Sequence, residues 1–119
     1  MEFKRLFTRQ EAERALPLVS RIVADILKTA GHIRELGESD ARLGHYEAEL
    51  QDCLAELEGI GCYYKDWSYS VGLVDFPAVI DGEQAFLCWR SDETGLAWYH
   101  GIEEGYRGRR PLPKSTAAG

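Results

Sequence analysis

The sequence predicts an α+β fold in which an antiparallel two-helix hairpin packs on one face of a three-stranded antiparallel β-meander. Two observations lead to this prediction. In the first half of the chain, apolar residues recur every three or four positions, which is the period of one helix face. After Gly61 the pattern changes, and apolar runs of strand length alternate with turn sequences such as Asp81-Gly82.

The first helix is predicted to begin after Thr8, because Thr8 and Glu11 have the spacing of a capping box. Pro17 lies within the helical pattern and cannot donate a backbone hydrogen bond, so we expect a kink or a break near it. Gly37 is the predicted end. The apolar face comprises Leu16, Val19, Ile22, Val23, Ile26, Leu27, Ala30 and Ile33.

The second helix is predicted to start at a cap formed by Ser39 or Asp40 and to stop at Gly59 and Gly61. The turn between the helices is short, which predicts that they run antiparallel. The apolar positions of the second helix are Leu43, Tyr46, Leu50, Cys53, Leu54 and Leu57.

Three strands are predicted, at 73–80, 84–90 and 96–102, and the aromatic segment 63–69 is interpreted as a strand or an ordered loop. Asp81-Gly82 is typical of a two-residue hairpin turn, and 93–95 suits a three-residue loop.

These turns predict a strand register. The first turn places Asp75 opposite Cys88, with Phe76 and Leu87 on the other, apolar face. A three-residue second loop places Cys88 opposite His100, so three polar side chains would form a row, with Arg90 or Arg109 near Asp75. A loop longer by one residue would move His100 to the apolar face, beside Leu87.

Composition limits the class of protein. The 119 residues suit a single domain, assigned to 1–112, with 113–119 as a flexible tail. A net charge of −6 argues against nucleic-acid binding, although 105–119 is locally basic. No apolar run is long enough to cross a membrane, and the start lacks a secretory signal. Three cysteines without paired spacing predict reduced thiols in a cytoplasm.

Four segments of the second half, GLVDFPAVIDG, FLCW, AWYH and GYRGRRPL, resemble the family called domain of unknown function 2203, and FTRQEAERALPLV is similar to its opening. One departure is Asp92, where the family usually has glycine. The resemblance covers nearly the whole chain and implies a bacterial or archaeal protein without an assigned activity. The family's motif positions fall on Asp75, Cys88, Trp89, Glu93, Trp98, His100, Gly105 and Arg109.

The preferred function is a small binding or interaction module with a ligand site on the polar face of the meander and no cofactor. Its partners would be a second copy of the chain and either another protein or a small anionic ligand. Leu18, Val19 and Leu57 are the residues expected at a homodimer contact. The candidate ligand-binding residues are Asp75, Cys88, Glu93, Trp98, His100 and Arg109.

An alternative remains open for Asp75, Cys88 and His100. The three residue types suit a metal site, or a thiolate nucleophile with a histidine base, so enzymatic activity is undecided. The simplest interpretation is structural: a buried cysteine, a hydrogen-bonded histidine and an aspartate that anchors a turn.

Overall fold

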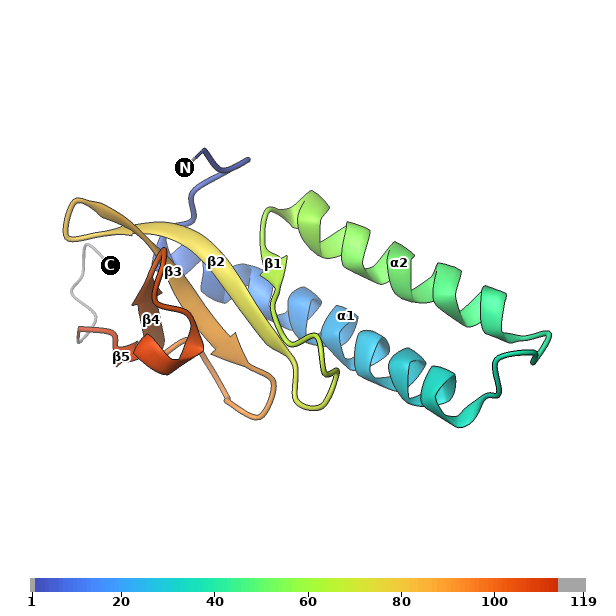
Figure 1. Ribbon diagram of the computed structural model, residues 1–119. Helices are drawn as coiled ribbons and strands as arrows, with labels where there is room; N and C mark the ends of the chain where they lie inside the picture. Colours follow the sequence, from blue (N-terminus) through green and yellow to red (C-terminus); the bar gives the residue numbers. More distant parts are fainter. Residues whose placement is uncertain (1, 114–119) are drawn as a thin grey trace.

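The computed structural model describes residues 2–113 and confirms the α+β class (Figure 1). The two helices lie side by side, and the turn that joins them extends away from the sheet. The molecule is therefore elongated, at 52 × 25 × 24 Å. The helices and strands are α1 (Arg9–Glu35), α2 (Leu43–Ile60), β1 (Tyr63–Tyr64), β2 (Leu73–Ile80), β3 (Glu83–Arg90), β4 (Trp98–Gly101) and β5 (Arg110–Pro111), with a short 3-10 turn at Tyr106–Gly108.

The start of α1 confirms the predicted capping box. The Thr8 side chain accepts a hydrogen bond from Glu11 N at 3.0 Å, and the Glu11 carboxylate accepts one from Thr8 N at 2.9 Å. The helix is continuous through Pro17, so it does not break or restart there. A bend at Pro17 stays a prediction.

The start of α2 differs from the prediction. Neither Ser39 nor Asp40 is the cap, because the helix begins at Leu43 after Arg42, without a capping side chain. Asp40 instead accepts hydrogen bonds from the backbone and guanidinium of Arg42 in the preceding turn. Of the two glycines predicted to stop the helix, Gly61 is confirmed, because it ends α2 with a left-handed φ of 108°, and Gly59 lies within the helix.

The sheet has five strands in the order β1-β2-β3-β4-β5, and the prediction of three was wrong. The two additional strands lie at the edges and consist of two residues each. β1 lies in the segment 63–69 that we interpreted as a strand or an ordered loop, and β5 lies in the locally basic segment 105–119. Of the predicted flexible tail, 114–119 lies outside the described residues.

The β2–β3 register agrees with the prediction at every pair, including Asp75 opposite Cys88. The β3–β4 register does not: Cys88 lies opposite Trp98, and His100 lies opposite Phe86. The predicted three-residue loop was too short, because β3 ends at Arg90 and β4 starts only at Trp98. Glu93 organises this longer loop, since its carboxylate accepts from Arg90 N at 2.7 Å.

One core cluster joins both helices to one face of β2 and β3. It includes Val23 and Ile26 of α1, Leu57 of α2, and Phe76 and Leu87 of the sheet. The packing of the whole hairpin on one face of the sheet stays a prediction. Val19 and Leu57 have 0% exposure, so the prediction that they form a dimer contact was wrong for both.

No helix among residues 2–113 combines the length and the apolar character needed to cross a bilayer.

Candidate functional site

Asp75, Cys88 and His100 meet on the face of the sheet that points away from the shared core. On β2, Asp75 lies directly opposite Cys88 of β3. On β4, His100 lies opposite Phe86, which is two residues from Cys88 along β3. Strands two apart are separated by about 10 Å, so Asp75 and His100 reach toward each other across β3. All three side chains are buried, and their potential ligand atoms lie within 4.8 Å of one another. We call this group the Asp75–Cys88–His100 cluster.

Both ring nitrogens of His100 face hydrogen-bond acceptors. Nδ1 lies 2.8 Å from the carbonyl oxygen of Gly101, and Nε2 lies 3.1 Å from each carboxylate oxygen of Asp75. A carbonyl can only accept, so Nδ1 carries a proton. An ionised Asp75 carboxylate likewise accepts from Nε2–H, and with both nitrogens protonated the contact is an imidazolium–carboxylate pair.

The surroundings of His100 favour its charged form. Burial acts to lower the pKa of the imidazole, but Asp75 and the neighbouring Cys88 thiol outweigh it and raise the pKa from 6.5 to about 10. The ring also lies against Phe86, with 5.5 Å between ring centroids. The cluster therefore contains a positively charged imidazole ring that contacts the Gly101 carbonyl, the Asp75 carboxylate and the Phe86 ring.

A pocket of about 250 Å³ opens above the cluster. The cluster contributes to its wall, and Lys65 and Tyr106 lie at the pocket as well. We call this cavity the His100 pocket; its other lining residues are Leu73, Phe86, Ile102 and Gly105. Lys65 lies 5.4 Å from the centroid of the Phe86 ring, and no carboxylate in residues 2–113 is within ion-pair distance of it.

The other predicted site residues form a neighbouring group. The guanidinium of Arg109 donates to Glu93 at 2.7 Å and to the carbonyl of Cys88 at 3.1 Å, and it lies 5.0 Å from the centroid of the Trp98 ring. Glu93 and Arg109 thus neutralise each other beside the cluster. None of Glu93, Trp98 and Arg109 lines the His100 pocket, although the Nε of Arg109 is buried without a hydrogen-bond partner.

Neither arginine that we expected near Asp75 pairs with it. Arg90 forms an ion pair with Asp92, and Arg109 forms one with Glu93. The cationic partner of Asp75 is His100.

A comparison with protein-family models gives a match over residues 5–112 to a family described as "Uncharacterized conserved protein (DUF2203)". The chain belongs to the DUF2203 family. No curated protein and no solved structure matches it.

Sequence reasoning about this DUF2203 domain missed Lys65 and Tyr106 of the pocket. Lys65 directly follows the short strand β1, which pairs with β2 next to Asp75. Tyr106 belongs to the turn after β4. The sequence did indicate that Lys65 lies in the aromatic segment 63–69, which could be a strand. However, the strand there has only two residues, and the register of so short an edge strand cannot be predicted from the sequence.

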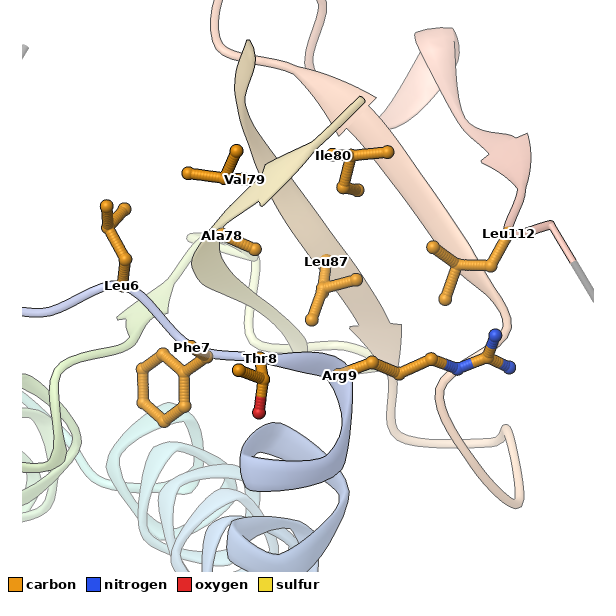
Figure 2. Close-up of a pocket in the computed structure, with 9 residues that line it drawn as sticks. All are labelled: Leu6, Phe7, Thr8, Arg9, Ala78, Val79, Ile80, Leu87 and Leu112. Carbon is orange, nitrogen blue, oxygen red and sulfur yellow. The ribbon is translucent and has the colours of Figure 1, made fainter. Parts of the chain in front are cut away.

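A second cavity of this DUF2203 domain, of about 340 Å³, lies beside the start of α1 and offers a different chemistry (Figure 2). Leu87 and Ile80 point into it from the sheet, and Leu112 lies across from them. Thr8 and Arg9 supply its polar side chains, and both already have partners: Thr8 is the helix cap, and Arg9 bonds Glu13. The His100 pocket is therefore the better candidate for a functional site.

Proposed function

We propose that this DUF2203 domain is a binding module that takes a small anionic ligand in the His100 pocket. The observation that carries the proposal is that one cavity is lined by both Lys65, whose ammonium has no carboxylate partner among residues 2–113, and the buried imidazolium of His100. Charge-assisted hydrogen bonds from lysine are stronger than neutral ones, and the pocket supplies an apolar wall beside them. A volume of about 250 Å³ suits a ligand smaller than a typical drug.

In this proposal Lys65 supplies the positive charge that attracts the anion, and His100 forms part of the pocket wall. Because Asp75 already balances His100, a bound anion would gain its net attraction from Lys65. The ammonium of Lys65 lies 5.9 Å from the centroid of the Tyr63 ring and 5.4 Å from that of the Phe86 ring. Because Phe86 lines the pocket together with Lys65, this contact supports a position of the ammonium at the cavity.

Thermal unfolding in the presence of small anions tests this proposal. Phosphate, acetate and short dicarboxylates would each be compared with chloride at equal ionic strength. We expect one class to raise the melting temperature, and Lys65→Met to remove that rise. Lys28→Met is the matched control, because Lys28 is an exposed lysine on α1. A rise that survives Lys65→Met, or no rise with any of these anions, would contradict the proposal.

The geometry favours binding over cysteine-dependent catalysis. A histidine base must have a nitrogen free to take the thiol proton, and here both nitrogens face other acceptors. Cys88 also lies in the middle of β3 and not at a helix N-terminus, where reactive thiolates are commonly stabilised.

Homodimer formation and a cytoplasmic location are further parts of the proposal. Leu18 remains exposed on α1, at 50%, and a symmetric contact would cover it. Light scattering at high micromolar concentration should give a dimer, and Leu18→Glu should shift it to monomer; a wild-type monomer would count against the contact.

Three cysteines without disulfide bonds fit a reducing compartment.

A further inference from the structure

We propose that Asp75, Cys88 and His100 form a binding site for one divalent transition-metal ion of the zinc class. The three residues come from three neighbouring strands and converge at one point above β3. This inference goes beyond ligand binding in the His100 pocket and does not depend on it.

The donor set selects the class of ion. One thiol, one imidazole and one carboxylate match the ligands that zinc and similar ions use in proteins. Calcium and magnesium prefer oxygen ligands in larger number, and the cluster offers oxygen from Asp75 alone. The thiolate and the imidazole therefore favour a softer ion.

The orientation of His100 matches that of a metal ligand. Metal-bound histidines generally donate the remaining ring N–H to a carbonyl or carboxylate, which fixes the ring. The 2.8 Å contact between His100 Nδ1 and the Gly101 carbonyl holds the ring in this way and directs Nε2 at the Asp75 carboxylate.

The distances are close to those of a tetrahedral site. Nitrogen and oxygen ligands bound to zinc at about 2.0–2.1 Å are about 3.3 Å apart. His100 Nε2 and the Asp75 oxygens are 3.1 Å apart. A sulfur ligand would lie about 3.6 Å from the other two, and the upper limit of 4.8 Å means that Cys88 must move by only about 1 Å.

Three protein ligands leave one position of a tetrahedral ion free. All three residues line the His100 pocket, so that position would open into the cavity and not into the core. Zinc sites with three protein ligands and an open position are the kind that binds water or a further ligand. Entry of the ion displaces the proton from His100 Nε2 and the proton from the Cys88 thiol, both to solvent.

Titration of the metal-free protein with cobalt(II) and zinc tests the site directly. We expect one equivalent of cobalt to bind and to give the near-ultraviolet charge-transfer band of a cobalt–thiolate bond. Zinc should displace the cobalt with the same stoichiometry. Calorimetry in buffers of different ionisation enthalpy should detect proton release on binding.

Variants assign the ligands. Serine is nearly the same size as cysteine, so Cys88→Ser should preserve the packing and remove the cobalt–thiolate band. It should also lower zinc affinity by more than about 100-fold, because losing an outer-shell partner usually costs up to about that much and Cys88 is a direct ligand. Cys53→Ser is the matched control, since Cys53 is a buried cysteine of α2 away from the cluster, and it should leave the band intact. Far-ultraviolet circular dichroism would verify folding of each variant.

The outcomes are distinct from those of the anion experiment. Lys65→Met should bind zinc like the wild type, because Lys65 is not a ligand. Absence of stoichiometric binding, or a cobalt–thiolate band that survives Cys88→Ser, would overturn the metal site and leave a buried His100–Asp75 ion pair. Should Asp75→Asn or His100→Gln fail to fold, the Cys88→Ser and Cys53→Ser pair still decides the question.

Discussion

The charge of His100 follows from two neighbours that can only accept hydrogen bonds. The Gly101 carbonyl and the Asp75 carboxylate each require a proton on the facing ring nitrogen. Buried ion pairs add little net stability, but removing one member is costly because the other charge is left without a partner. We therefore expect this pair to fix the arrangement of three strands more than to strengthen the fold.

In the metal-free protein, His100 should remain protonated well above pH 7. Burial alone would lower its pKa, and the Asp75 and Cys88 contacts raise it from 6.5 to about 10. NMR of the ring carbons, assigned with His100→Gln, should show an imidazolium at pH 8 that titrates in the alkaline range. A neutral ring at pH 8 would contradict the assigned contacts.

The same shift makes stability depend on pH. Because the pKa of His100 is higher in the folded state than in the unfolded state, its contribution is fully present below about pH 6.5 and is lost as pH rises through about 10. Burial also raises the pKa of Cys62, to about 12, which acts in the same direction. Urea unfolding of the wild type should therefore be compared with Asp75→Asn, whose alkaline decline should be smaller.

Leu87 tests which sheet face belongs to the core. It is 1% exposed and belongs to the shared core cluster, so Leu87→Ala should cost about 2–5 kcal/mol of unfolding free energy. Val79→Ala is the control, because Val79 borders the same apolar cavity but is 52% exposed (Figure 2). Chemical denaturation would measure both. A cost for Leu87→Ala below about 0.5 kcal/mol, the usual range of surface substitutions, would place it outside the core.

The cluster could be predicted from the sequence although one register was wrong. The Asp81-Gly82 turn determines the β2–β3 pairing, and this part was correct. The second loop was assigned too few residues, which displaced His100 by two positions, from Cys88 to Phe86. Because side chains alternate with a period of two, this displacement kept His100 on the same face, and its ring still reaches Asp75.

At the scale of elements, strong local signals were predictable and edge strands were not. The capping box and Gly61 determine helix ends through contacts within a few residues. β1 and β5 are two residues long, and their pairing depends on what lies beside them in space. The 91–97 loop depends on side-chain contacts of Glu93, which turn rules based on glycine position do not include.

Two glycines near the end of α2 should respond oppositely to alanine. Gly59 lies within the helix, and an added Cβ would meet no atom within 4 Å. Gly59→Ala should therefore stabilise the protein by up to about 1 kcal/mol. Gly61 has a φ of 108°, and its Cβ would lie 2.5 Å from Arg5 Cγ.

Gly61→Ala should for this reason destabilise the protein by more than about 1 kcal/mol, because the left-handed cap and the contact with Arg5 are both strained. Thermal denaturation of the two variants side by side measures the difference. Equal effects of the same sign would show that α2 does not end at Gly61 as described.

At the scale of the whole molecule, burial is concentrated at one end of the helical hairpin. The buried residues of α1 extend only to Ala30, and those of α2 start only at Leu50. The far ends of both helices and the turn between them lie away from the sheet (Figure 1). Helical stability in proteins comes mostly from packing of an apolar face, so this end has less to hold it.

Amide hydrogen exchange should therefore differ along the molecule. We expect residues 31–46 to exchange at least about tenfold faster than 73–90, because within 31–46 only Ile33 packs against the shared core and opening disturbs it little. Exchange measured by mass spectrometry on peptides from these two regions gives the comparison. Gly31→Ala should slow the first region, since its Cβ would approach only Arg34, at 4.0 Å, and alanine favours the helix. Equal protection of both regions would mean that the hairpin and the sheet unfold as a single unit, and that the far end is held by contacts other than the shared core.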